Sequence, residues 1–117
     1  EKAAYFRWLF FAAGPFEQAV IAETIGWEVP NGRQSTTGFG SLSLTADTCH
    51  EWLKKNDFIT GKRFTMADVY FGSQFVWCLR LGVIEDNSIF RKYVNRVTDR
   101  TAYQKAKFID SELKKGL

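Results

Sequence analysis

Cysteine, proline, histidine and methionine are all scarce in this chain, and their scarcity excludes several classes of protein. Among 117 residues there are two Cys, two Pro, one His and one Met. Cys49 and Cys78 form no CxxC motif and are too few for a disulfide framework, which favours a reducing, cytoplasmic location. With one histidine, His50, and two cysteines far apart, we expect no metal site. Cys49 and His50 are adjacent, so on a helix their side chains diverge by about 100° and form no catalytic dyad.

Long apolar runs and a strong excess of either charge are also absent. The longest apolar stretch, WLFFAAG at residues 8–14, is far shorter than the ~20 residues that cross a bilayer, so no membrane partner is expected. Sixteen Lys and Arg against thirteen Asp and Glu leave a net charge of +3. That balance does not indicate binding to nucleic acid.

Apolar and aromatic residues, in contrast, are plentiful. Hydrophobic residues make up 45% of the chain and aromatic residues 16%, with eleven Phe and four Trp. A chain of this length forms one domain, residues 1–117, with a single core. Because aromatic side chains carry much of the energy of both cores and interfaces, some of them are expected at a partner surface.

The spacing of the apolar residues predicts an all-α protein, a bundle of about five to six helices. Residues 2–13 give a helix with a wide apolar face, which Gly14 and Pro15 should kink or divide into a closely abutting pair. Residues 30–41 are rich in Gly, Ser and Thr and predict a loop. Further helices are expected at about residues 44–55, 66–81, 88–97 and 102–115. Their expected caps are Ser41 or Ser43, Thr65, and Asn87 or Ser88.

The segment GKRFTMADVYF, residues 61–71, places an aspartate directly before an apolar run. If Thr65 is the N-cap, its hydroxyl accepts from the N–H of Asp68, and the Asp68 carboxylate accepts from the N–H of Thr65. Phe64 and Val69 then occupy the positions of a hydrophobic staple. The carboxylate also lies at the positive end of the helix dipole. Thr65 and Asp68 are therefore predicted to form a structural cap, and no catalytic role is assigned to the aspartate.

The helix that starts at Met66 is apolar on nearly every side, which predicts a buried central helix in the bundle. Gly72 and Ser73 would let a neighbouring helix approach closely. Gly82 is expected to end the helix, because glycine readily takes the left-handed conformation of a C-cap.

Four segments of the chain, in order, resemble the C-terminal helical domain of bacterial cytosolic glutathione transferases. YFRWLFFAAGPFEQAV is similar to the kinked first helix of that domain, and TGFGSLSLTADTCHEWL resembles the linker and second helix of a proteobacterial subgroup. GKRFTMADVYFGSQ looks like the start of the central helix. FRKYVNRVTDRTAYQKA resembles the closing segment, with Thr101 in place of the proline in an Arg-Pro-Ala-Tyr motif. The similarity covers essentially the whole chain.

The resemblance implies a part in glutathione chemistry. Family members bind glutathione, the co-substrate, mainly on a thioredoxin-like N-terminal domain that carries the activating Ser, Tyr or Cys, and this sequence contains no such domain. The glutathione thiolate attacks a hydrophobic electrophile held in an adjacent apolar pocket. The helical domain lines that pocket and contributes to a two-fold homodimer. The implied partners are thus the electrophile, a second copy and the missing domain, and the isolated chain is expected to be inactive.

The resemblance also places the pocket wall on the first helix. Phe10, Gly14, Glu17 and Gln18 match cleft-facing positions of the bacterial beta class, in which His and Lys tend to occupy the last two. Residues spaced i, i+4 and i+7 share a helix face. Phe11, with Phe10, would enlarge an apolar pocket. Core packing or a dimer contact explains the two phenylalanines equally well, and a solvated helix face is the alternative for Glu17 and Gln18.

Four residues are candidates for the dimer surface because Trp and Tyr are enriched at interface centres. They are Tyr5, Trp8, Leu9 and Trp52. Internal packing explains each of them equally well.

Two other functions stay open. The first is a glutathione-dependent redox or isomerase enzyme of the same fold, which only the activating residue of the missing domain would distinguish from a transferase. The second is a non-catalytic interaction module, which a collapsed pocket would favour.

Overall fold

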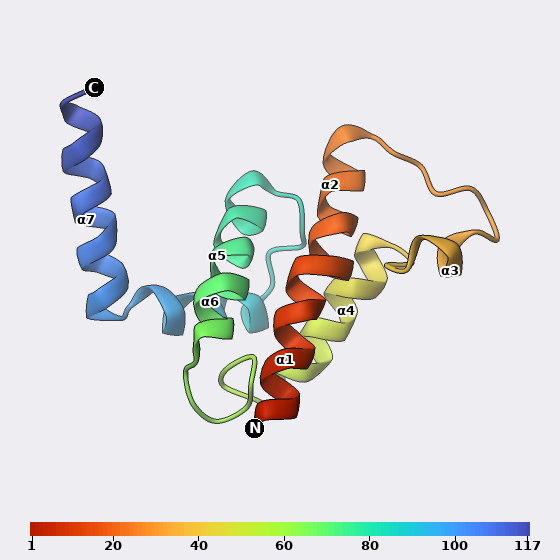
Figure 1. The fold of residues 1–117 in the computed structure, drawn as a ribbon, viewed down its shortest axis with the longest axis horizontal. Helices are drawn as coiled ribbons and strands as arrows, with labels where there is room; N and C mark the ends of the chain where they lie inside the picture. Colours follow the sequence, from red (N-terminus) through yellow and green to blue (C-terminus); the bar gives the residue numbers. More distant parts are fainter.

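The computed structural model describes all 117 residues, and its regular structure is helical (Figure 1). In chain order the elements are α1 (Lys2–Phe11), η1 (Ala12–Phe16), α2 (Glu17–Ile25), α3 (Gln34–Thr37), α4 (Leu42–Leu53), α5 (Met66–Leu81), α6 (Ser88–Thr98) and α7 (Thr101–Lys115). Because α1, η1 and α2 follow one another without a break, they form one long helix. The prediction of an all-α bundle with about five to six helices is confirmed.

The first long helix changes its winding where the sequence predicted a kink. Residues Ala12–Phe16, which include Gly14 and Pro15, form a π-helical turn between α1 and α2. Pro15 has no N–H, and its ring would clash with a carbonyl of the preceding α-helical turn. A single wider turn accommodates the ring and lets the helix continue.

The core lies between the first long helix, α4, α5 and α6, and six of its 14 residues are aromatic. Phe71 packs edge-to-face against Phe16 and against Phe75, with ring centroids 5.1 Å apart in both pairs. Trp8 packs against Trp52 at 5.3 Å. Pairs of this geometry add stability beyond the area they bury, so much of the aromatic content serves the fold.

The helix ends follow the cap chemistry that the sequence predicted. Ser41 caps α4, and its hydroxyl accepts from a backbone N–H of the first turn at 3.2 Å. Asn87 caps α6 and accepts from two N–H groups at 3.0 and 3.1 Å. Ser41 and Asn87, and not Ser43 and Ser88, are therefore the caps. Gly82 ends α5 with a φ of 69°, the left-handed conformation expected there.

The close approach predicted at Gly72 is also present. A Cβ added to Gly72 would lie 2.9 Å from Cγ1 of Val97 on α6, so only a glycine leaves room for this helix crossing. Ser73 differs: its side chain is exposed, and its hydroxyl donates to the carbonyl oxygen of Tyr70 at 2.7 Å.

Two expectations about the elements were wrong. Residues 30–41 are not entirely loop, because α3 forms one helical turn in which the Thr37 hydroxyl donates to the carbonyl oxygen of Gln34 at 2.8 Å. Such a turn is closed by local bonds and leaves no apolar periodicity to detect.

The second error concerns α5, which is not enclosed on all sides. It packs against α1 and α6, but Met66, Trp77 and Leu81 are 64%, 55% and 63% exposed. Apolar residues all around a helix predict that it is buried on every side. Burial also requires enough neighbouring helices, and those of this chain cover only part of the circumference of α5.

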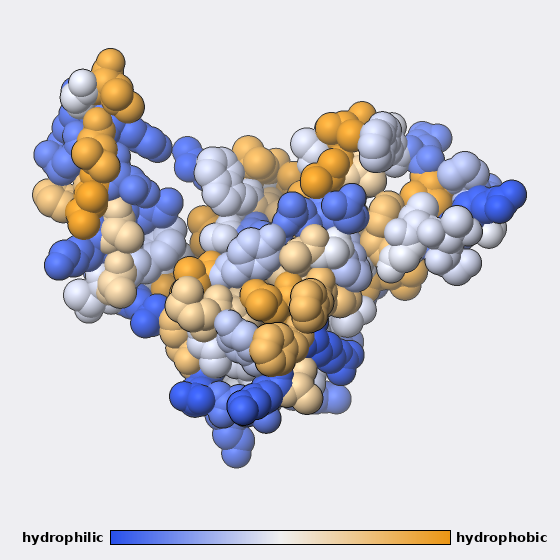
Figure 2. All heavy atoms as spheres, in the orientation of Figure 1, coloured by the Kyte–Doolittle hydropathy of each residue, from blue (hydrophilic) through white to orange (hydrophobic).

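The last helix, α7, projects from the body of the molecule (Figure 1). None of its residues is buried, and it contacts α6. Apolar side chains follow one side of it toward the C-terminus (Figure 2). The exposed apolar residues of α7 include Ile109 and Leu113, which at i and i+4 share a face of the helix. Neither this helix nor any other combines the length and the hydropathy that a membrane span requires.

Candidate functional site

The Asp68 carboxylate is fully buried at the first turn of α5 and accepts four hydrogen bonds. Its Oδ2 accepts from the Thr65 N–H at 2.9 Å and from the Thr65 hydroxyl at 3.3 Å. Its Oδ1 accepts from the Ile59 N–H at 2.7 Å and from the Tyr93 hydroxyl at 3.0 Å. The predicted capping box is present. With two donors on each oxygen, the buried carboxylate is fully hydrogen-bonded, and it joins α5 to α6 and to the preceding loop.

Tyr93 is a neighbour of Asp68 that sequence reasoning missed. Burial raises the pKa of its phenol well above the ordinary range, and the nearby Asp68 carboxylate raises it further. The phenol therefore stays protonated at neutral pH and donates to the carboxylate. No spacing in the sequence indicates this contact, because Tyr93 lies 25 positions from Asp68. The arrangement stabilises the fold, and Asp68 keeps the structural role predicted for it.

An apolar cleft of about 270 Å³ lies between α2, the end of η1 and α5. Its lining residues are Phe16, Glu17, Val20, Ile21, Tyr70, Ser73, Gln74, Trp77 and Cys78. Glu17 is the one carboxylate among them. The cleft therefore has apolar and aromatic walls and a single acidic group, the composition of a binding site for a small, largely apolar molecule.

Glu17 is held in position by two residues of α5. Its Oε2 accepts from the Tyr70 hydroxyl at 2.7 Å and from Nε2 of Gln74 at 3.1 Å. The same Nε2 donates to the carbonyl oxygen of Ala12 in the π-helical turn at 3.2 Å. The hydrogen bond to Glu17 raises the pKa of the Tyr70 phenol. These bonds join the carboxylate of α2 to α5 and fix its position in the cleft.

The five pocket residues expected on the first helix do not lie together. Only Glu17 lines the cleft between α2 and α5. Phe10 is 69% exposed, Gln18 is exposed, and the position beyond the Cα of Gly14 is open space. Phe11 instead packs against the core.

Each of the two phenylalanines has an aromatic neighbour that explains its position. Phe10 stacks on Phe6 with ring centroids 6.5 Å apart, on the outside of α1. Phe11 meets Trp8 and Phe71 edge-to-face at 5.3 and 6.3 Å. Core packing thus accounts for Phe11, whereas Phe10 contributes to an exposed apolar surface.

The four candidate dimer residues differ in their exposure. Trp8 is 1% exposed, so internal packing is its role in this chain. Trp52 is half-buried, and its indole N–H donates to the carbonyl oxygen of Ile59 at 2.9 Å. Tyr5 and Leu9 are half-buried on α1. These last three retain surface that a second copy can contact.

The α5 residues of the cleft were not identified from the sequence. Tyr70, Gln74 and Trp77 follow one another at i, i+4 and i+7, so they share a face of the helix. The sequence did hold a signal: Ser73 and Gln74 are uncharged polar residues in the apolar middle of the helix, which is typical of a face that does not belong to the core. The apolar content of the helix obscured that signal.

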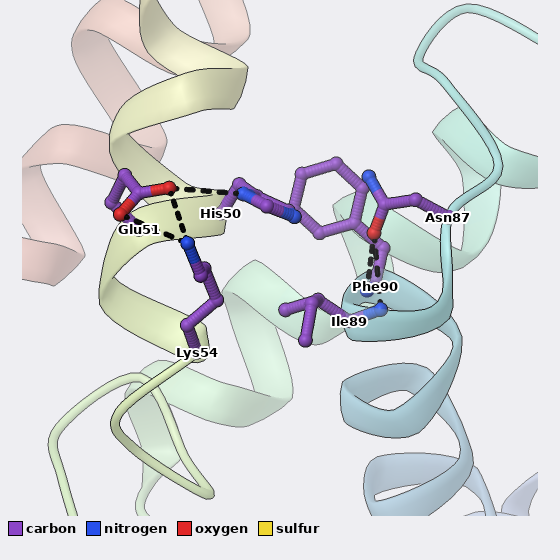
Figure 3. A network of polar contacts seen from close by, with 6 residues as sticks. All are labelled: His50, Glu51, Lys54, Asn87, Ile89 and Phe90. Carbon is purple, nitrogen blue, oxygen red and sulfur yellow. Dashed lines mark hydrogen bonds and ion pairs between the residues drawn. The ribbon is translucent and has the colours of Figure 1, made fainter.

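A second groove, of about 520 Å³, lies between α4 and the segment that leads into α6. At its edge, Glu51 contacts Nδ1 of His50 at 3.4 Å and Nζ of Lys54 at 3.1 Å (Figure 3). Lys54 first, and His50 second, lower the pKa of the Glu51 carboxyl. Exposed ion pairs of this kind contribute little, and Asn87 in the same groove serves as the cap of α6 (Figure 3). The side chains of this groove are accounted for by the fold.

Both cysteine thiols are buried, and burial raises the pKa of each. For Cys78, which lines the cleft between α2 and α5, the pKa is raised to about 11. Because the thiolate is the reactive form, Cys78 is a poor nucleophile at neutral pH. No three His, Cys, Asp or Glu side chains in the structure are grouped so that they could hold a metal ion.

The cleft between α2 and α5 is therefore the candidate site, and its chemistry is that of binding. It offers apolar walls, exposed aromatic rings and one positioned carboxylate. No family model, no curated protein and no solved structure matches this chain. The interpretation of the site accordingly depends on its own residues.

Proposed function

We propose that this chain is the C-terminal helical domain of a cytoplasmic glutathione transferase and forms the wall of its pocket for hydrophobic electrophiles. The observation that carries the proposal is the Thr65–Asp68 clasp. Its Asp68 side chain lies fully buried at the first turn of α5, in the segment that resembles the start of the family's central helix. The π-helical turn of the first helix, which contains Gly14 and Pro15, lies where the resemblance implies a kink and is a second feature that supports the proposal.

In this proposal the cleft between α2 and α5 receives the electrophile. Its apolar walls, which include Phe16, Val20 and Trp77, remove water from a hydrophobic substrate. The Glu17 carboxylate does not attract the negatively charged glutathione, so the cleft suits the electrophile better than the tripeptide. Bound glutathione supplies the attacking thiolate from a thioredoxin-like domain outside this chain. The protonated Cys78 thiol does not compete with it.

The proposal includes a homodimer in which Tyr5, Leu9 and Trp52 meet a second copy. All three are half-buried, and Tyr5 and Trp52 pack against the core. Amphipathic aromatic residues of this kind are enriched at interface centres.

The test is conjugation of glutathione to chlorodinitrobenzene by the polypeptide that the full reading frame encodes, with the 117-residue chain as the control. We expect turnover by the longer polypeptide and none by the isolated chain, because the activating residue lies outside the chain. Turnover by the isolated chain would contradict the proposal. So would a reading frame that encodes no thioredoxin-like region.

A non-catalytic interaction module is a second candidate, which one specific observation favours. Phe6, Phe10, Trp77 and Leu81 are each more than half exposed, and this chain does not enclose a pocket around Phe10 and Gly14. Exposed apolar residues in this number are typical of binding surfaces. A full-length protein that shows no turnover but elutes in a stable complex would favour this candidate.

A further inference from the structure

The Glu17 carboxylate has an unusual combination of partners. It is half-buried in an apolar cleft, and the two groups that donate to it, the Tyr70 hydroxyl and the Gln74 amide, are both neutral. Neutral donors satisfy the oxygen atom but leave the negative charge uncompensated. A charge withdrawn from water in this way attracts a cation more strongly than a fully solvated one.

Two aromatic rings beside Glu17 also favour a cation. Tyr70 and Trp77 line the same cleft and are 38% and 55% exposed. The face of an aromatic ring attracts a cation, most strongly for Trp. The guanidinium of Arg80 already lies over the Trp77 ring, 5.7 Å from its centroid. That contact takes up one face of the Trp77 ring, whereas no cation of the chain lies over the Tyr70 ring.

The remaining walls are apolar and complement the body of a ligand. Phe16, Val20 and Ile21 line the cleft on the side of the first long helix. Its volume of about 270 Å³ lies just below the range of about 300–1,000 Å³ that ligand sites occupy, and it suits a molecule of one or two rings. A ligand that uses all these features has an apolar body and one positively charged group.

We propose that the cleft between α2 and α5 binds hydrophobic amines, with the ammonium group paired to Glu17 and the apolar body against Phe16, Val20 and Trp77. Anions of the same shape are rejected, because the carboxylate repels them. The inference rests on the proposed function in so far as the co-substrate cleft would then select electrophiles that also carry such a positively charged group. It does not require glutathione.

The test is an NMR titration of the isotope-labelled chain at neutral pH with three matched probes: a naphthylethylamine, a naphthylethanol and a naphthylacetate. We expect the amine to bind most tightly and the carboxylate most weakly. The largest shifts should occur at the Tyr70 and Ser73 amides and the Trp77 indole. For Glu17→Gln we expect affinity for the amine to fall about five- to tenfold and affinity for the alcohol to stay unchanged.

The matched control is Glu23→Gln, which removes the same charge from an exposed position of α2 outside the cleft. This variant should bind the amine as the parent does. An equal loss of affinity for the amine in both variants would show that the effect comes from the overall charge of the chain, and it would overturn the inference. Equal affinity of the parent for amine and alcohol, or no binding up to the solubility limit of the probes, would also overturn it. These two comparisons need no variant and stand even if Glu17→Gln fails to fold.

The outcomes separate this inference from the proposed function. If the chain prefers the amine but the polypeptide encoded by the full reading frame shows no conjugation, the inference stands and the proposed transferase function is rejected. If the longer polypeptide shows conjugation but the chain has no preference for the amine, the inference is rejected and the proposed transferase function stands.

Discussion

Two carboxylates of this chain, Asp68 and Glu17, lie in surroundings that give them different roles. Asp68 is fully buried and accepts four hydrogen bonds, two of them from neighbouring elements. Glu17 accepts two hydrogen bonds at the wall of an open cleft. A carboxylate whose oxygen atoms are fully hydrogen-bonded suits a residue that holds elements together. A carboxylate that can accept further hydrogen bonds beside an apolar cleft suits a residue that binds a ligand.

The first prediction concerns Asp68→Ala. The substitution removes the acceptor of the buried Ile59 N–H and Tyr93 hydroxyl, so both donors lose their partner in the protein interior. We expect the free energy of unfolding to fall by about 3 kcal/mol, against about 1 kcal/mol for Ser41→Ala, a more exposed cap. Denaturant unfolding of both variants measures the difference. Equal losses would show that Asp68 is an ordinary cap.

At the scale of elements, the sequence predicts what local chemistry determines. The caps Ser41, Asn87 and Gly82 and the Thr65–Asp68 clasp all act within a few residues along the chain, so their spacing is visible before the fold is known. The turn α3 was missed because one turn has no apolar period. The exposure of α5 was missed because it depends on the number of other helices that pack on it.

The candidate site was predicted only in part for the same reason. Glu17 was identified on the first helix, but its partners Tyr70 and Gln74 are 53 and 57 positions away in the sequence. Such contacts arise only when α2 and α5 pack. The π-helical turn adds to the difficulty, because a wider turn changes which residues of the first helix share a face.

The second prediction tests the crossing of α5 and α6. In Gly72→Ala the new methyl group would lie 2.9 Å from Cγ1 of Val97, so the two helices must shift apart. We expect a loss of about 1–3 kcal/mol, because overpacking outweighs the roughly 1 kcal/mol that alanine gains over glycine in a helix. Thermal or denaturant unfolding of the purified variant measures this loss.

Gly14→Ala is the control for that experiment, since no heavy atom lies within 4 Å of the added Cβ. Here only helix propensity acts, and stability should be unchanged or slightly higher. The double variant Gly72→Ala, Val97→Ala should behave closer to Val97→Ala alone, because the clash is gone. If the Gly72→Ala variant has the same free energy of unfolding as the Gly14→Ala variant, α5 and α6 do not cross closely at Gly72.

At the scale of the whole molecule, stabilising contacts are concentrated in one part of the chain. The core cluster runs from Trp8 to Val97 and includes no residue of α7. The exposed large apolar residues lie outside it, on α1, α2, α4, α5 and α7 and in the segments that follow α2 and α7. The molecule therefore consists of an aromatic core, an apolar surface beside the cleft and a projecting helix that the core does not need.

The third prediction follows from that division. A chain that ends at Arg100 lacks α7 but keeps the contact of the Arg100 guanidinium with the Phe64 ring, 3.4 Å from its centroid. Because α7 buries no residue, we expect the free energy of unfolding to change by less than about 1 kcal/mol. Denaturant unfolding of the two chains at equal, low concentration measures this, so that association of the apolar side of α7 does not contribute. A loss as large as that of Asp68→Ala would mean that α7 packs on the body in solution, with Ile109 and Leu113 buried against it.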